Sequence, residues 1–132
     1  MLLAASLLAA IAVIAGALSA HMLEKKLGPE QISQLHTAAN YQMFHALGLA
    51  ALAALAGRLK KSQAASGGLL LGGGAVLFSF SIYFLATRSL WGAESIKWVA
   101  YITPVGGMLM ILGWLYLAFI AIRGMDQKRE RR

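Results

Sequence analysis

Four apolar stretches, separated by short polar segments, dominate this chain of 132 residues. They cover about residues 2–20, 41–59, 67–87 and 98–122, and a basic tail follows at residues 123–132. Each stretch is close to the roughly 20 residues that an α-helix needs to cross the hydrocarbon core of a bilayer. The pattern predicts an all-α membrane protein with a single domain, a bundle of four transmembrane helices.

Two interpretations of the first stretch compete. Ala17, Leu18 and Ser19 resemble the small-residue cleavage site of a signal peptide. However, no Lys or Arg precedes the apolar run, and the run is longer than a usual signal-peptide core. We therefore expect this stretch to remain as the first transmembrane helix.

The polar segment before the second stretch contains a helix boundary. Gly28 suits the end of one helix, and Pro29 suits the first turn of the next. Beyond them, the apolar residues Ile32, Leu35 and Ala39 recur three and four positions apart. This spacing predicts a short amphipathic surface helix that leads directly into the second transmembrane helix.

The fourth stretch is interrupted by Thr103-Pro104. Either Thr103 caps a helix that starts at Pro104, or a longer helix is kinked there, because proline lacks a backbone N–H. Residues 98–102 are themselves apolar. We therefore expect a kinked or broken helix across the whole stretch.

Small residues at helical spacing predict where these helices approach each other closely, since membrane helices pack through Gly and Ala. Three such residues lie four apart in the first helix, and two do so in the third. The predicted packing positions are Ala12, Gly16, Ala20, Gly48, Gly68, Gly72, Gly106 and Gly113.

Composition supports the membrane class and narrows the chemistry. The chain is 59% apolar and 13% charged, whereas about 25% of the residues in a soluble domain are charged. The lack of cysteine excludes disulfides, thiolate metal sites and a Cys nucleophile. No ionisable side chain lies in the middle of any stretch, which argues against a proton relay or an ion pathway.

The distribution of cations predicts the orientation in the membrane. The net charge is +7, but no basic face interleaved with aromatic residues is present, so we expect no nucleic-acid partner. Eight cations lie on the side of Arg58, Lys60, Lys61 and the tail, and four lie on the other side. The positive-inside rule then predicts a multi-pass protein of the inner (cytoplasmic) membrane with both termini in the cytoplasm. The four opposing cations are Lys25, Lys26, Arg88 and Lys97.

Two of these opposing cations have simple interpretations. Arg88 ends the third stretch, where its side chain can extend to the headgroup region or pair with a lipid phosphate. Lys97 lies three residues after Glu94, a spacing that predicts a weak, exposed ion pair.

Three histidines near the first two helices raise the question of a metal or haem site. His36 and His45 are nine residues apart, so they point to opposite sides of a continuous helix. His21 could join one of them, but no carboxylate or thiolate completes a ligand set. We expect no cofactor and no metal, and we keep His21, His36 and His45 as weak candidates.

A cluster of polar residues at the start of the second stretch has two interpretations. Such side chains can form hydrogen bonds between helices, each contributing about 0.6 kcal/mol in a membrane. Alternatively, together with polar residues of the other helices, they form a mouth that binds a ligand. The candidate residues for either role are His21, Asn40, Tyr41, Gln42, His45, Tyr83 and Thr103.

Several motifs, spread over all four helices, resemble a known family. They are Gly16-Ala17-Leu18-Ser19-Ala20-His21, Tyr41-Gln42-Met43-Phe44-His45-Ala46-Leu47, Ser79-Phe80-Ser81-Ile82-Tyr83, and Thr103-Pro104-Val105-Gly106-Gly107 with Gly113-Trp114. Together they resemble the DUF423 or UPF0382 family of small membrane proteins, in which glycine tends to replace Ser19. The resemblance implies a four-helix inner-membrane protein with an uncleaved N-terminus, and it implies no activity.

We expect a non-enzymatic protein, because no catalytic set of residues lies at a usable depth. The first hypothesis is a structural or assembly factor, or an accessory subunit of a larger membrane complex. Association of several copies of this chain into a homo-oligomer is the alternative partner prediction. The second is a protein that binds or transports a lipid, a quinone or another small amphiphile. The third is a haem- or metal-binding redox protein.

Overall fold

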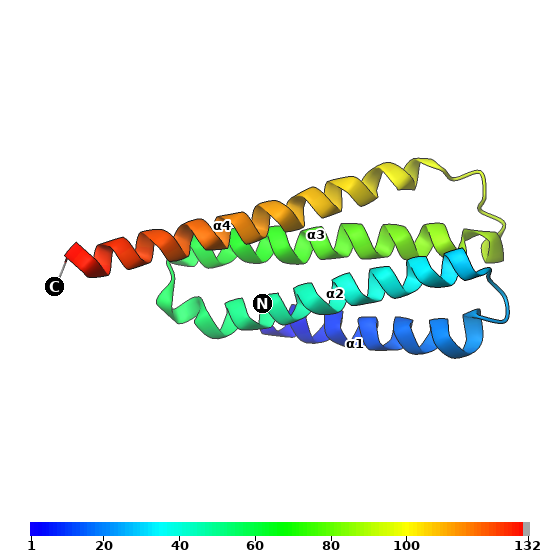
Figure 1. Ribbon diagram of the computed structural model, residues 1–132, viewed down its shortest axis with the longest axis horizontal. Coiled ribbons are helices and arrows are strands. Elements are labelled where there is room, and N and C mark those ends of the chain that lie inside the picture. Colours follow the sequence, from blue (N-terminus) through cyan, green and yellow to red (C-terminus); the bar gives the residue numbers. More distant parts are fainter. Residues whose placement is uncertain (131–132) are drawn as a thin grey trace.

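The chain folds into four α-helices joined by short connections (Figure 1). The computed structural model describes residues 1–130, and their side chains through residue 124; the side chains of most of the predicted basic tail therefore lie outside the described residues. The helices are α1 (Leu2–Leu18), α2 (Pro29–Leu55), α3 (Lys61–Thr87) and α4 (Ile102–Glu130). A π-helical turn, Ser19–Leu23, extends α1, and 3-10 turns occupy Ala56–Arg58, Arg88–Trp91 and Trp98–Tyr101.

The helices run antiparallel in chain order (Figure 1). The start of α1 and the end of α4 therefore lie toward the end of the molecule that carries the α2–α3 connection. The opposite end carries the α1–α2 and α3–α4 connections, residues 19–28 and 88–101, and we call it the distal end. Large aromatic side chains are exposed there: Trp91, Trp98 and Tyr101.

The prediction of an all-α protein with four helices is confirmed, but only three helices are long and apolar enough to cross a membrane. These are Leu2–Leu23, Lys61–Trp91 and Trp98–Gly124, within the described part of the chain. The predicted span at residues 41–59 is not supported in this way, because polar residues of α2, among them the exposed Asn40 and the buried Gln42 and His45, lower its mean hydropathy.

The predicted surface helix is not a separate element. α2 is one continuous helix of 27 residues from Pro29 to Leu55. No Gly or Pro lies between Pro29 and Gly48, so nothing in this segment interrupts the helical hydrogen bonds. The surface segment and the second apolar stretch are therefore two halves of the same helix.

Two other predicted boundaries change in the structure. α3 begins six residues before the predicted position, and the backbone N–H of Lys60 donates to Gln63 Oε1 (3.0 Å) at its start. In the fourth stretch, the 3-10 turn Trp98–Tyr101 changes to α-helix at Ile102. Pro104 thus lies in the first turn of α4, where its missing N–H costs no helical hydrogen bond.

The four helices form an open row. α1 packs against α2, α2 against α3, and α3 against α4, whereas α1 and α4 make no comparable contact in the described chain. A closed four-helix bundle would also pair the first helix with the last. The open row leaves one groove between α1 and α3 and another between α2 and α4.

Glycines allow the closest approach between helices, at the crossing of α3 and α4. A Cβ atom on Gly106 would meet the backbone of Phe78 and lie 2.9 Å from the carbonyl oxygen of Gly74. A Cβ on Gly113 would lie 2.8 Å from Leu71 Cδ2. Backbone contact of this kind requires glycine.

The remaining predicted packing positions divide into two groups. Cβ atoms on Gly48, Gly68 and Gly72 would lie 2.9, 2.9 and 3.4 Å from side chains of neighbouring helices, and Ala12 is buried. Gly16 and Ala20 make no such contact within the described chain, since a Cβ on Gly16 would meet nothing within 4 Å and Ala20 is exposed. Residues four apart are offset by about 40° around the helix axis at each step. The line through Ala12, Gly16 and Ala20 therefore turns progressively away from α2.

Candidate functional site

His45 connects α2 to α4. The indole N–H of Trp114 donates to His45 Nε2 at 3.2 Å, and His45 Nδ1 lies 2.7 Å from the carbonyl oxygen of Tyr41. The tryptophan nitrogen can only donate, so Nε2 must be the acceptor and Nδ1 must carry the hydrogen. Both ring nitrogens of His45 therefore have protein partners.

Aromatic packing reinforces this connection. The Tyr41 ring stacks on His45 and lies 5.1 Å from Phe78 of α3 between centroids. The indole of Trp114 lies 6.1 Å from the His45 ring and covers Gly48. The four aromatic rings thus join α2, α3 and α4 near the middle of the row.

Gln42 points the other way, toward α1. Its side chain is fully buried, and Nε2 donates to the carbonyl oxygen of Leu8 at 2.7 Å. On α3, the buried Ser79 hydroxyl donates to the carbonyl oxygen of Ala38 at 3.1 Å. These two bonds hold α2 between its neighbours.

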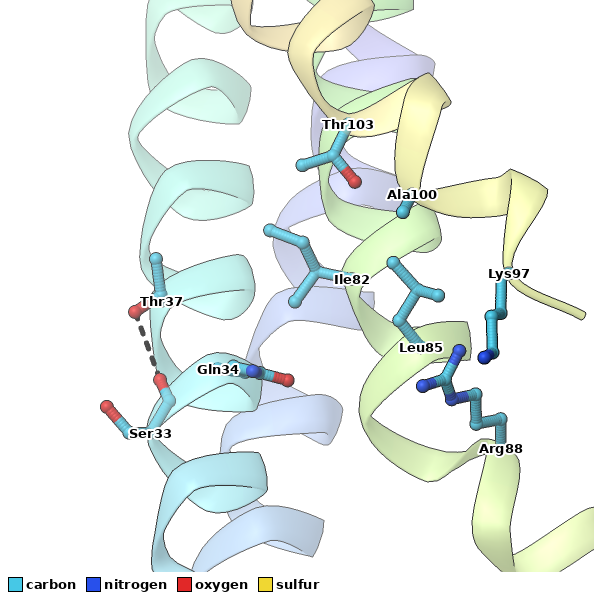
Figure 2. Close-up of a pocket in the computed structure, with 9 residues that line it drawn as sticks. All are labelled: Ser33, Gln34, Thr37, Ile82, Leu85, Arg88, Lys97, Ala100 and Thr103. Atoms are coloured by element: carbon cyan, nitrogen blue, oxygen red, sulfur yellow. Dashed lines mark hydrogen bonds between the residues drawn. The ribbon is translucent and has the colours of Figure 1, made fainter. Parts of the chain in front are cut away.

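A cavity opens at the distal end between α2, α3 and the start of α4 (Figure 2). We call it the distal cleft; its volume is about 600 Å³. The exposed aromatic residues Trp91, Trp98 and Tyr101 lie at the same end, and Trp and Tyr concentrate at the level of lipid headgroups in membrane proteins. It is lined by Ser33, Gln34, Thr37, Ile82, Leu85, Arg88, Lys97, Ala100 and Thr103.

Two cations reach the distal cleft. Arg88 and Lys97 come from either side of the α3–α4 connection, and Figure 2 shows their charged groups close together beside Leu85. The described lining contains no carboxylate, and the predicted ion pair of Lys97 with Glu94 does not form. Arg88 Nη1 makes one long hydrogen bond of 3.5 Å, to the carbonyl oxygen of Ile96. Most of its donors therefore remain for a ligand.

Hydroxyl groups complete the polar part of the cleft. Ser81 donates to the carbonyl oxygen of Phe78 at 2.9 Å, so the 2.8 Å bond between Ser81 and Thr103 must use the Thr103 hydrogen. Thr37 donates to the carbonyl oxygen of Ser33 at 3.0 Å. Thr103 and Thr37 therefore present acceptor lone pairs, whereas the cations present donors.

A second cavity of about 340 Å³ lies between α2 and α4 toward the chain termini. Its walls are apolar apart from Arg58, and they run from Gly48 to Leu59 on one side and from Trp114 to Gly124 on the other. Trp114 closes the end nearest to His45. The space between α2 and α4 is thus polar and cationic at the distal end and apolar beyond Trp114.

The candidate residues predicted from the sequence do not line a single ligand-binding opening in the structure. Thr103 lines the distal cleft, and Tyr41 and His45 lie deeper on the same side of α2. Gln42 faces α1, and Tyr83 lines a different cavity. His21 and Asn40 are exposed and belong to neither group.

Sequence reasoning did not select the cleft residues Ser33, Gln34 and Thr37, and it treated Arg88 and Lys97 separately. The sequence does contain a reason to group Arg88 with Lys97: the two cations lie near the two ends of one short connection that has tryptophans beside it. The three histidines do not converge, because no cluster of three potential ligands (His, Cys, Asp or Glu) occurs among the described residues.

Comparison with known proteins identifies a family but no activity. The family described as "Protein of unknown function (DUF423)" matches residues 15–107. A UPF0382 membrane protein of Staphylococcus epidermidis is 38% identical over 115 residues, 87% of this chain and 88% of the relative. No solved structure matches the chain.

Two further relatives agree with this result. The UPF0382 membrane protein YwdK of Bacillus subtilis is 36% identical, over 87% of this chain and 89% of the relative. The UPF0382 inner membrane protein YgdD of Escherichia coli is 35% identical, over 93% of this chain and 89% of the relative. The chain therefore belongs to the DUF423 (UPF0382) family of membrane proteins of unknown function.

Proposed function

We propose that this protein crosses the membrane four times and binds an anionic amphiphile, such as a phospholipid, by its headgroup in the distal cleft. The observation that carries the proposal is the pair Arg88 and Lys97 in a cavity of about 600 Å³ whose described lining contains no carboxylate. Two cations held together without a counterion repel each other, and an anion between them removes that repulsion.

The lining groups suit a phosphate. A guanidinium offers N–H donors in a planar fork that matches two phosphate oxygens, and an ammonium adds a compact point charge. The lining has no imidazole or carboxylate that could act as a general base. The cleft therefore supports binding, not a chemical reaction.

The fourth membrane crossing is supported by the packing of α2. Mean hydropathy treats each polar side chain as if it met lipid, but Gln42 and His45 are buried and bonded to α1 and α4. Polar groups that are hydrogen-bonded inside the protein, here Gln42 Nε2 and both ring nitrogens of His45, do not prevent a helix from crossing the bilayer. Gln42 Oε1 has no partner among the described residues. With both termini in the cytoplasm, as the cation count predicts, the distal cleft faces the outer leaflet.

Lipid retention in mild detergent tests the headgroup site. We expect the purified protein to retain phosphatidylglycerol in preference to phosphatidylcholine in native mass spectrometry. Replacing both cations (Arg88→Gln with Lys97→Gln) should remove this preference. The matched control removes two cations at the other end (Lys60→Gln with Lys61→Gln) and should leave it unchanged. Equal losses in the two variants would show that overall charge, not the cleft, selects the lipid.

A role as a structural factor or accessory subunit stays a prediction. The outer faces of α1 and α4 carry many exposed apolar side chains, among them Leu3, Leu7, Leu112 and Leu115. Lipid covers such faces as well as a partner helix does, so the geometry favours the binding role.

A further inference from the structure

A separate cavity lies on the far side of α3 from the distal cleft. Its volume is about 310 Å³, and it lies between the end of α1, the first turns of α2 and the distal half of α3. At about 100° per residue, its α3 residues and those of the cleft fall on roughly opposite faces of the helix. It is lined by Ala15, Leu18, Ser19, Leu23, Leu35, Phe80, Tyr83, Phe84 and Thr87.

One polar atom in this cavity lacks a partner. The Tyr83 hydroxyl oxygen is buried and has no hydrogen-bond partner in the described structure. The other two hydroxyl groups donate to their own helices, Ser19 to the carbonyl oxygen of Ala15 and Thr87 to that of Tyr83, both at 2.7 Å. An unpaired hydroxyl is costly in a membrane, where no water is at hand to bond it.

The occupant of this cavity must be largely apolar. The hydroxyl groups of Ser19, Tyr83 and Thr87 are the polar side-chain groups of its lining, and the remaining walls are hydrocarbon, mostly from leucines and phenylalanines. The π-helical turn Ser19–Leu23 supplies two wall residues, Ser19 and Leu23. Such turns are rare and are frequently found at functional sites.

We propose that this cavity binds a lipid-soluble molecule through a carbonyl oxygen that accepts a hydrogen bond from the Tyr83 hydroxyl. The volume is at the lower end of the range for small-molecule pockets, enough for a ring or part of a chain. Phe80 and Phe84 supply aromatic walls. The ester of a glycerolipid and the ring ketone of a quinone both provide this chemistry.

Binding of two probes to the purified full-length protein tests the proposal and distinguishes a glycerolipid ester from a quinone ketone as the carbonyl that is bound. The probes are dioctanoylglycerol, an ester, and a short-chain isoprenyl benzoquinone, a ring ketone. We expect one of them to bind and to raise the melting temperature. Tyr83→Phe should weaken that binding about three- to tenfold, the effect of losing one hydrogen bond. Tyr101→Phe, which changes an exposed tyrosine, is the matched control and should change nothing.

Stability without ligand gives an independent readout. Removing a hydroxyl that has no partner should leave the melting temperature of the ligand-free protein unchanged or higher. The proposal fails if neither probe binds, or if Tyr83→Phe binds both as tightly as the unmodified protein. A lower melting temperature of ligand-free Tyr83→Phe also contradicts it, since the hydroxyl would then have a partner in the ligand-free protein. The double variant at Arg88 and Lys97 should bind these uncharged probes normally, so the two sites can fail separately.

Discussion

The substitution Gly106→Ala, at the crossing of α3 and α4, gives the most specific prediction about the stability of the protein. The added methyl group would lie 2.8 Å from Phe78 Cα and 2.9 Å from the carbonyl oxygen of Gly74. Ordinary contacts of a Cβ begin at 3.4 Å. Because the obstacles are backbone atoms, no side-chain rotation can relieve them. α4 must move away from α3 by at least about 0.6 Å to clear Phe78 Cα, and further to clear the Phe78 backbone nitrogen, which lies closer still.

The size of the effect follows from this displacement. A gap of 0.5–1 Å removes about a quarter to a half of the dispersion energy of each atom pair across it. With about 0.1–0.2 kcal/mol per pair and a few dozen pairs at a helix crossing, the loss is about 1–3 kcal/mol. This agrees with the usual cost of overpacking a well-packed core.

Gly107→Ala is the matched control, because its methyl group would lie 3.7 Å from the Phe78 ring, an ordinary contact. Both substitutions change Gly to Ala in the same turn of α4, so the difference in helix propensity cancels. We expect unfolding of the protein in mixed micelles by SDS to show Gly106→Ala about 1–3 kcal/mol less stable than Gly107→Ala. Equal stability of the two variants would refute the close backbone crossing.

Two further predictions concern α2. Trp114→Phe removes the hydrogen bond to His45 and should lower the free energy of unfolding by about 1 kcal/mol, whereas Trp98→Phe, at an exposed position, should not; equal effects would contradict the bond. The chain has no cysteine, so single thiols introduced by Lys25→Cys and Ser62→Cys report the two ends of α2. If α2 crosses the membrane, an impermeant maleimide should label them from opposite sides; labelling from one side would exclude the crossing.

The candidate site could be predicted only in part. The sequence identified Thr103 and noted that Arg88 could meet a lipid phosphate, but it paired Lys97 with Glu94. The pairing failed because residues three apart meet reliably only on a helix, and the structure has turns and irregular chain between Gly92 and Lys97. The interhelical role proposed for the polar cluster was closer to the structure for Gln42, since the residues one turn away on α2, Ala38 and Ala46, are buried and apolar.

The sequence alone determined the class of this protein: helical, membrane-embedded and a member of a family recognisable from short motifs. These properties are local, since the length and hydropathy of a segment do not depend on its neighbours. Only the tertiary structure decided that Arg88 and Lys97 share a cleft and that Trp114 bonds to His45 across 69 positions of the chain. It also decided that the Tyr83 hydroxyl has no partner among the described residues. Each of these depends on how far a helix is rotated about its own axis and which helix lies beside it, and side chains from the whole chain set that rotation together.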